Sequence, residues 1–439
     1  MSSAQVSRAS SGAPARPNPR SPRLSQGLSA FKHRNYRLFF IGQLISVIGT
    51  WMQTTAQAWL VLQLTSSAFK VSLVAVFQFL PVLFFSLLGG IVADRLPKRN
   101  LLVVTQILSA IEAAILAVLV GTGRIELWHV YLLALALGIV SAFDMPARQA
   151  FVVEMVGKED LVNAVALNSA MFNGARVIGP AIAGVLIAVA GTTICFGLNA
   201  ASYIAVIICL LMMAVPTKVR AAGRGGMSDI REGLAYVRAT PALFLPIVLV
   251  GFVATFGMNF QVWVPLLAKH EFKAGAGEFG ALTAALGIGS MIGALGLAFR
   301  NTKPRYSFMI GTAILLAVMN ILLAVAGAIP LPIAVALIIL PFIGCAMTMT
   351  MAIANSIIQT ESRDELRGRV MSVYMMVFGG TAPFGALLAG ALASGLSTPA
   401  SIAIGGFVTL AAALAISTRR HLAVSARPSY IDVPTSADD

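Results

Sequence analysis

Charge is scarce in this chain: Asp, Glu, Lys and Arg together make up 11% of its 439 residues, against about 25% in soluble domains. Cysteine is scarce as well, and Cys195, Cys209 and Cys345 all lie within apolar segments, so we expect no disulfide framework. The four histidines are scattered without metal-ligand spacing, and no G-x-x-x-x-G-K-[ST] phosphate-binding loop occurs. Nor do a nucleophile, a base or metal ligands cluster as an enzyme would need. We therefore expect no enzyme, no metal or other cofactor and no ATP-driven pump.

Apolar residues take the place of the missing charge. They make up 58% of the sequence, and the mean hydropathy is +0.87. Apolar stretches long enough to cross a hydrocarbon core of about 30 Å recur twelve times, at about 38–62, 69–93, 100–120, 129–147, 165–190, 194–215, 243–266, 279–299, 307–328, 331–354, 370–394 and 399–417. Backbone amides in lipid must be paired within the segment. The sequence therefore predicts an all-α membrane protein with twelve transmembrane helices.

The net charge of +14 follows the predicted topology. The loops and tails on the N-terminal side of the twelve spans hold 26 of the 31 Lys and Arg residues. The opposite loops hold four, namely Lys70, Arg124, Lys269 and Lys273. By the positive-inside rule, we expect both termini to be cytoplasmic, with the chain in the cell membrane, most simply a bacterial inner membrane. The basic balance therefore does not indicate a nucleic-acid partner.

Two motifs recur at a fixed separation. Gly90 opens GIVADRLPKR and Gly296 opens GLAFRNTKPR, 206 residues later, while Gly179 and Gly385 are again 206 residues apart. Two halves in the same orientation, each of six helices, explain this spacing. The predicted organisation is a disordered N-terminal tail at 1–35, a first half at 36–215, a cytoplasmic linker at 216–242, a second half at 243–418 and a C-terminal tail at 419–439. Pro-, Ser- and Arg-rich composition without an apolar core argues against a signal peptide in the first tail.

These features resemble the major facilitator superfamily over essentially all twelve spans. The loop GGIVADRLPKR is similar to that family's signature loop, matched by Gly90, Asp94, Arg95, Lys98 and Arg99. The fifth span resembles its antiporter motif, matched by Gly179, Pro180 and Gly184. FKHRNYRLFFIGQLIS, DMPARQAF and ELRGRVMSVY resemble more narrowly the transmembrane secretion effector branch, which includes the bacterial enterobactin exporter. The resemblance implies the major facilitator fold and a secondary transporter that works by alternating access.

The resemblance also gives the signature loop a role. In the family, the loop acid contacts the start of the eleventh helix, which Leu366–Val370 would supply here. Asp94 is therefore expected to latch the cytoplasmic side of the transporter. The neighbouring bases Arg95, Lys98 and Arg99 would pair with acids of other cytoplasmic loops, such as Glu361, Asp364 and Glu365. The alternative is a loop that only anchors the topology.

Three charged residues fall within predicted spans away from the first residues of a span, where each is a functional candidate. Asp144 and Arg176 are expected to pair, either as a structural lock between two helices or as part of the transport machinery. Ala134 stands where the family often has an arginine tied to proton coupling, so we expect one of two acids to carry the proton. Asp144 is favoured because its helix would line the cavity; Glu112 is the other, unless it is merely protonated or snorkels.

The family lines its cavity with helices one, four, seven and ten. In this chain these helices offer polar, aromatic and methionine side chains, Gln53, Gln57, Asn259, Gln261, Trp263, Met347, Met351 and Asn355. Ordinary helix packing is the alternative for each. The scarcity of charge favours a mostly uncharged, amphipathic cargo such as a drug-like molecule or a siderophore. We expect proton-coupled export by a monomer; uptake, facilitated diffusion, and a non-transporting receptor or scramblase stay open.

Overall fold

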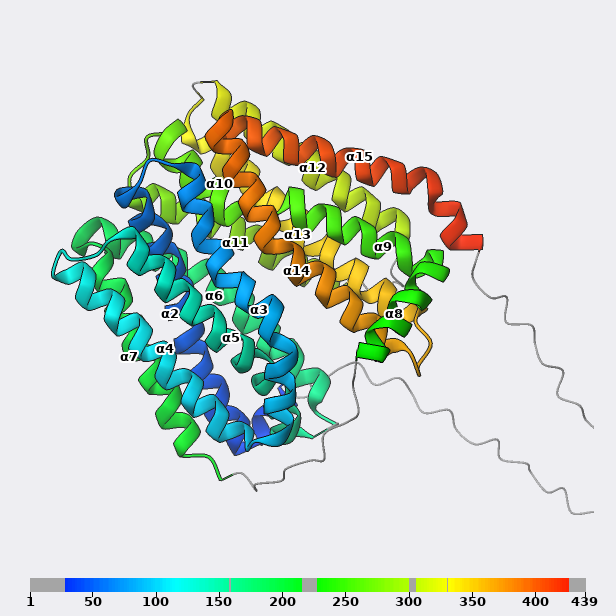
Figure 1. The fold of residues 1–439 in the computed structure, drawn as a ribbon, viewed down its shortest axis with the longest axis horizontal. Helices are drawn as coiled ribbons and strands as arrows, with labels where there is room; N and C mark the ends of the chain where they lie inside the picture. Colours follow the sequence, from blue (N-terminus) through cyan, green and yellow to red (C-terminus); the bar gives the residue numbers. More distant parts are fainter. Residues whose placement is uncertain (1–27, 158, 215–226, 300–304, 330, 426–439) are drawn as a thin grey trace, which may run out of the picture.

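The computed structural model describes residues 28–157, 159–214, 227–299, 305–329 and 331–425, and these ranges are built from helices without a β-strand (Figure 1). After the short helix η1 (Ser29–Lys32), the first half contains α2 (Arg34–Leu64), α3 (Ala68–Arg95), α4 (Lys98–Gly121), α5 (Leu127–Val156), α6 (Leu161–Ala190) and α7 (Thr192–Leu211). Helix α8 (Met227–Ala239) precedes the second half. That half contains α9 (Pro241–Phe252), η2 (Val253–Gly257), α10 (Phe260–Leu266), η3 (Leu267–Glu271), α11 (Ala276–Ala298), α12 (Tyr306–Ala328), α13 (Ile333–Glu361), α14 (Arg367–Gly395) and α15 (Thr398–Ser425).

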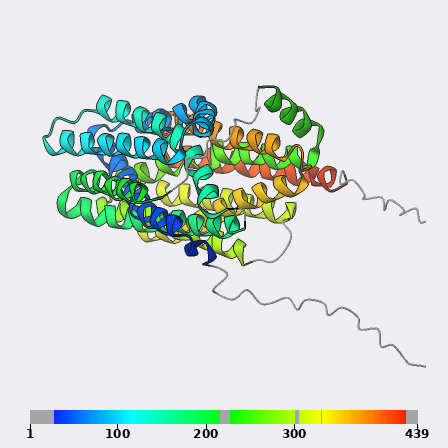
Figure 2. The ribbon, with the colours of Figure 1, turned by 90° about the horizontal axis from the view of Figure 1, so that it is seen from below.

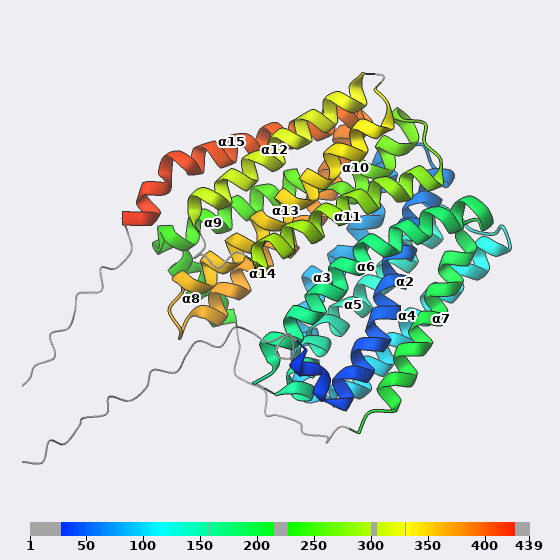
Figure 3. The same ribbon diagram turned by 180° about the vertical axis from the view of Figure 1, so that it is seen from behind.

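The two halves repeat the same packing. Helix α3 packs on α5 as α11 packs on α13, and α4 packs on α7 as α12 packs on α15. The halves lie side by side (Figure 2) and meet along two crossings, α3 with α14 and α6 with α11. Figure 3 shows α6 and α11 facing each other at this boundary. The predicted pair of parallel six-helix repeats, the major facilitator fold, is confirmed.

Eleven segments of the described chain are long and apolar enough to cross a membrane, judged by length and composition. They coincide with the second to twelfth predicted spans. The first predicted span lies in α2, which is long enough at 31 residues but carries the buried glutamines Gln43, Gln53 and Gln57. Helix α5 continues to Val156, well beyond the predicted end at 147, because helical hydrogen bonding does not stop where apolar residues do. This extension changes the environment of Asp144.

The seventh predicted span is interrupted. Met258 and Asn259 break the helix between η2 and α10, and two amides satisfy carbonyl groups near the break. Asn259 Nδ2 donates to the carbonyl of Thr255 (2.8 Å), and Asn320 Nδ2 donates to the carbonyl of Gly257 (3.1 Å). Irregular backbone at membrane depth is tolerated where protein groups replace the lost partners. Gln261, two residues after the break, is exposed.

Glycines allow helices to approach closely within the second half. A Cβ on Gly289 would lie 1.8 Å from the carbonyl oxygen of Pro341, and one on Gly293 would lie 2.7 Å from that of Cys345. Both contacts join α11 to α13. The face of α11 that carries Gly289 and Gly293 is therefore a small-residue packing surface.

The bundle has two ends, which we name by the chain. The terminal end carries the start of α2 and the end of α15; the opposite end carries the turns before α3 and after α6. At the opposite end the halves are joined: Trp59 stacks on Phe279 with ring centroids 5.5 Å apart, and the backbone N–H of Phe69 donates to Ser394 Oγ (2.9 Å). The boundary between the halves is thus closed at the opposite end.

The predicted tails and linker are partly ordered. Residues 29–32 form η1 and α2 begins at Arg34, inside the tail predicted at 1–35. Helix α8 lies in the linker predicted at 216–242, and α15 extends to Ser425 in the tail predicted at 419–439. The remainder of these three segments lies outside the described residues.

Candidate functional site

A buried carboxyl group lies at the centre of the first half. Glu112 of α4 is 4% exposed, and its Oε2 accepts from Gln53 Nε2 of α2 (2.9 Å). Gln53 Oε1 in turn accepts from Asn199 Nδ2 of α7 (2.7 Å). The second oxygen, Oε1, is buried without a hydrogen-bond partner. Among the described residues no cation pairs with Glu112, so an ionised carboxylate there would lack a counter-charge.

Glycine makes this network possible. A Cβ on Gly49 would lie 2.5 Å from Asn199 Oδ1 and 2.7 Å from Ser202 Oγ. Ser202 Oγ donates to that same Asn199 oxygen (3.0 Å). Three helices, α2, α4 and α7, therefore converge on a chain of neutral polar groups that ends at Glu112.

Asp144 is paired, and its partner is not the predicted one. Its Oδ2 accepts from Arg148 Nε (2.9 Å) and forms a short ion pair with Nη2 of the same guanidinium. Its Oδ1 accepts from Thr105 Oγ1 (2.8 Å) and Gln106 Nε2 (2.9 Å). The predicted Asp144–Arg176 pair is therefore wrong. Because α5 continues past residue 147, Arg148 lies one helical turn after Asp144 on the same face of the helix. Its guanidinium therefore neutralises the charge of the Asp144 carboxylate.

Arg176 lies at the middle of α6, which runs from Leu161 to Ala190. Its guanidinium carbon is 5.5 Å from the centroid of the Trp51 ring, and Phe172 meets the same ring edge-on at 5.6 Å. It forms no hydrogen bond or ion pair with any residue that the structure describes. A cation over an indole face is stabilised by the ring quadrupole, but its charge is not neutralised.

A small pocket opens between the halves. Its polar lining consists of Thr54 and Gln57 of α2, Gln78 of α3 and Gln261 of α10, and alanine and valine side chains of α2 and α3 form the rest. Gln57 and Gln261, two of the residues expected in the cargo cavity, line this pocket. Gln78 was missed because the second helix was not counted among the cavity helices. The sequence feature that could have identified Gln78 is its amide side chain within an otherwise apolar run.

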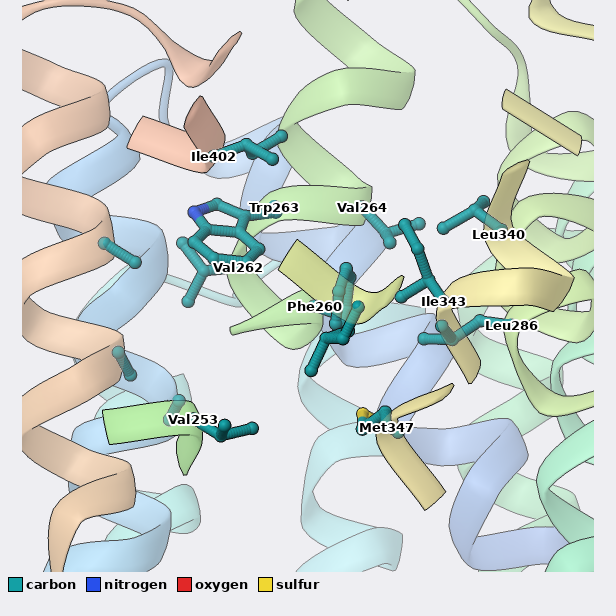
Figure 4. Packing of buried hydrophobic residues seen from close by; sticks show 14 of the residues in the cluster. Val253, Phe260, Val262, Trp263, Val264, Leu286, Leu340, Ile343, Met347 and Ile402 are labelled. Carbon is teal, nitrogen blue, oxygen red and sulfur yellow. The ribbon is translucent and has the colours of Figure 1, made fainter. Parts of the chain in front are cut away.

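The other candidate cavity residues lie elsewhere. Gln53 belongs to the Glu112 network, and Asn259 caps the break in the seventh span. Trp263 and Met347 are packed inside the second half (Figure 4), and Trp263 Nε1 donates to Ser401 Oγ (3.0 Å). Met351 and Asn355 are partly buried. Asn355 Oδ1 accepts a hydrogen bond from Gln359 Nε2, one turn further along α13. Helix packing explains these positions better than cargo contact.

The predicted latch contact of Asp94 is not found among the described residues. Asp94 is exposed and has no hydrogen bond or ion pair with any described residue, and a Cβ on Gly90 would meet nothing within 4 Å. The expected contact with the start of α14 is absent. Arg369, within that segment, pairs instead with Glu232 of α8 (2.5 Å).

The bases of the signature loop also have partners other than those expected. Lys98 Nζ pairs with Glu154 of α5 (2.7 Å), and Arg99 Nη2 donates to the carbonyl of Leu211 (3.1 Å). Both contacts stay within the first half. The predicted pairing with acids of the second half is therefore not found for these two residues.

The antiporter-motif helix α6 seals the boundary at the opposite end. A Cβ on Gly184 would lie 2.9 Å from the Cα of Gly280 in α11. Gly179 meets α2 in the same way, because its Cβ would lie 2.6 Å from that of Trp51. Pro180 lies inside the helix between them. These small residues let α6 pack closely on α2 of its own half and on α11 of the second half.

A charged clasp joins the chain before α2 to the turn between α5 and α6. Lys32 Nζ and His33 Nε2 both contact Asp160 Oδ2, at 2.7 Å and 2.8 Å. These hydrogen bonds hold the pKa of the Asp160 carboxyl well below its usual range, and the bond with Asp160 raises the pKa of Lys32. No local sequence pattern indicates this contact, because it joins segments 127 residues apart.

A repeat of two six-helix halves that meet at paired crossings, with a polar pocket between them, defines a transporter of the major facilitator type. Solved structures share the fold: a POT family transporter in complex with 5-aminolevulinic acid matches with a TM-score of 0.72 at 12% identity, over 88% of this chain and 96% of that one. Residues 25–430 match the family described as transmembrane secretion effector. The chain belongs to that family, as the three sequence motifs predicted, and is a transporter rather than an enzyme.

Three relatives cover most of the chain. The multidrug efflux pump Tap of Mycolicibacterium fortuitum is 30% identical over 81% of this chain and 88% of its own length. The staphyloferrin A transporter of Staphylococcus aureus is 28% identical over 80% and 88%. The enterobactin exporter EntS of Shigella boydii is 25% identical over 85% and 89%. The chain is therefore a multi-pass membrane transporter similar to drug and siderophore transporters.

Proposed function

We propose that the protein exports a small amphipathic compound, a drug-like molecule or a siderophore, in exchange for protons by alternating access. The observation that carries the proton step is Glu112, which is buried without a cation among the described residues. Burying a charge without a partner is costly, which favours the neutral acid in this environment. Relatives described as an efflux pump and an exporter support the outward direction.

The proton is assigned to Glu112 in preference to Asp144. Asp144 already accepts from Arg148, Thr105 and Gln106, so both of its carboxylate oxygens are engaged in this structure. Glu112 has a single neutral donor and a free oxygen. A carboxyl group that carries a proton must exist as the neutral acid during part of the cycle. The surroundings of Glu112 permit this.

One proton per cycle supplies enough energy. A charge that crosses a potential of 100 mV releases about 2.3 kcal/mol, and about 1.4 kcal/mol corresponds to a tenfold concentration ratio. A neutral compound could therefore be held at a gradient of roughly fifty-fold. A single chain contributes both sides of the pocket, so we propose that the monomer is the working unit.

We propose that the terminal end faces the cytoplasm, on the basis of its Lys and Arg excess. In a background without native cysteines, we would label Arg363→Cys, in the turn before α14, and Gly123→Cys, in the turn before α5. A membrane-impermeant maleimide added to intact cells should label Gly123→Cys and spare Arg363→Cys. The reverse labelling pattern would show that the terminal end faces outward, and it would contradict both the proposed topology and the proposed direction of transport.

We propose that Asp94 contacts the start of α14 when the terminal end closes. Asp94→Asn should reduce transport at least tenfold at normal membrane abundance, whereas Glu159→Gln, an exposed acid at the same end, should not. Cysteines at Asp94 and Gly368 should cross-link more readily when substrate is present. Normal transport by Asp94→Asn would leave the loop a topological anchor.

The decisive experiment is reconstitution in vesicles with an imposed pH gradient, using a panel of dyes and siderophores. Cargo movement should follow the gradient and stop when a protonophore collapses it. Movement that ignores the gradient would support facilitated diffusion, and lipid movement without cargo movement would support a scramblase. Either result would contradict proton-coupled export.

A further inference from the structure

We propose that Arg176 and Trp51, together with the glutamine pocket beside them, bind a cargo that carries an anionic group. This inference rests on the proposed transport function and names the chemical class of the cargo. It starts from the unpaired guanidinium. Arg176 is 15 residues from the start of α6, or about 22 Å at 1.5 Å per residue, which places it near mid-depth of the bundle.

The acids of the first half at membrane depth are engaged elsewhere. Asp144 is held by Arg148, and Glu112 accepts from Gln53. Charged side chains within a membrane bundle normally pair or line a substrate path. Since Arg176 has no partner in the described chain, an anion supplied from outside would complete its environment.

The cation and the pocket lie on one continuous face. Trp51, Thr54, Ala58 and Val61 follow one another at three- and four-residue spacings, so they lie along the same face of α2. The last three line the pocket, and Arg176 lies over the first. Gln57 is six residues beyond Trp51, a rise of about 9 Å.

The face therefore offers three kinds of contact in sequence. The guanidinium can bind a carboxylate through two parallel hydrogen bonds, and the indole beside it can pack on an aromatic ring. At the far side, Gln57, Gln78 and Gln261 offer both donors and acceptors. A compound with a carboxylate or similar anion, an apolar body and a neutral polar end fits this arrangement.

Arg176 lies at the boundary between the halves, because a Cβ on Gly287 of α11 would lie 2.6 Å from its carbonyl oxygen. Arg176 and Trp51 are partly exposed, and Phe172, which meets Trp51 edge-on, is 51% exposed. An uncharged cargo was expected from the sequence because the helices predicted to line the cavity carry almost no charge. With Arg148 as the partner of Asp144, the remaining charge beside the pocket is positive.

The test compares an anionic probe with a neutral amide of the same shape. Full-length protein in phosphatidylcholine nanodiscs is equilibrated by dialysis with 2-naphthoate or 2-naphthamide at pH 7.5, and binding is read from naphthalene fluorescence. The wild-type protein should bind 2-naphthoate at least tenfold more tightly. Equal affinity for the two probes in the wild-type protein would overturn the proposal without any variant.

Variants then locate the preference. Arg176→Gln should bring the two affinities within twofold, Arg176→Lys should keep part of the preference, and Arg124→Gln, which removes an arginine at the opposite end, should keep all of it. A preference that survives in Arg176→Gln would overturn the assignment. Loss of 2-naphthoate binding when phosphatidylglycerol is added to the discs would assign the site to lipid headgroups and overturn the cargo proposal.

The two proposals fail separately. Proton-driven transport in vesicles without a preference for 2-naphthoate would remove the anion site and leave the exporter. A preference for 2-naphthoate that Arg176→Gln abolishes, in a protein that moves nothing along a pH gradient, would remove proton-coupled export and leave the binding site.

Discussion

Gln53 Nε2 donates to Glu112 Oε2 at 2.9 Å, and this neutral amide stands where a structural ion pair would have a cation. The arrangement joins α2, which lines the pocket through Thr54 and Gln57, to α4 in the interior of the first half. A change in the protonation of Glu112 would alter the hydrogen bond that holds one side of α2. The contact therefore offers a physical link between a proton and the cargo-facing helix.

Glu112→Gln should uncouple transport from the proton gradient. The amide keeps the shape of the side chain and can still bond to Gln53, but it cannot exchange a proton. We expect gradient-driven export to fall at least tenfold, while exchange of labelled for unlabelled cargo across vesicles without a gradient persists. Glu365→Gln, an exposed acid in the turn before α14, is the control and should stay coupled. Full coupling in Glu112→Gln would move the proton site elsewhere.

Asp144→Asn should destabilise the first half without a specific effect on coupling. Loss of a hydrogen bond to a charged partner costs about 1.5–3 kcal/mol, and Arg148 would be left without its carboxylate. The measurement is unfolding in a detergent–denaturant series. Adding Arg148→Gln should cost less than the sum of the single changes, whereas adding Arg176→Gln should be additive, because contacts alone produce coupling. Coupling between Asp144 and Arg176 would contradict the structure.

Gly280→Ala should weaken the closed opposite end. Its Cβ would lie 2.6 Å from the Cα of Gly184 and 2.8 Å from the carbonyl oxygen of Pro180, and overpacking of this kind costs about 1–3 kcal/mol. The population open at that end should rise roughly tenfold. This can be read from the alkylation rate of Gln261→Cys by an impermeant maleimide.

Gly277→Ala is the matched control for this experiment, because it lies one turn earlier on α11 and its Cβ would meet nothing within 4 Å. It should alkylate at the parental rate. Equal rates in the two alanine variants would show that the glycine contact does not hold the halves together.

The clasp at Asp160 should release in acid. The hydrogen bonds with Lys32 and His33 lower the pKa of Asp160. The contribution of Asp160 to the stability of this contact is therefore complete above the ordinary carboxyl pKa near 4 and declines as the pH falls below it. The hydrogen bond with Asp160 raises the pKa of Lys32. The contribution of Lys32 to the same contact is therefore complete below the ordinary lysine pKa and is lost only in strong base. A spin label at Leu28→Cys should be immobile from about pH 5 to pH 9 and gain mobility below about pH 4. Asp160→Asn should make the label mobile at every pH, and an immobile label in that variant would contradict the prediction.

The sequence determined the architecture. Apolar runs of membrane length, a 206-residue repeat and the loop and α6 motifs were enough to predict an all-helical, two-half transporter, because bilayer thickness and backbone hydrogen bonding leave few other solutions. The same reasoning identified Glu112, Asp144 and Arg176 as the charges to explain, since charge within a span is rare. It also placed Gln57 and Gln261 among the residues of the cavity.

The tertiary structure decided which of these groups meet. Hydropathy ends a span where apolar residues end, whereas helix α5 continues to Val156, and that extra length gave Asp144 the partner Arg148. The contacts of Glu112 with Gln53 and of Arg176 with Trp51 join helices that are far apart in the sequence, so no local pattern encodes them. Helix rotation also sent Trp263 and Met347 into the second half and brought Gln78 to the pocket. Single-sequence periodicity fixes an apolar face, but which neighbour that face meets depends on the packing of all the helices together.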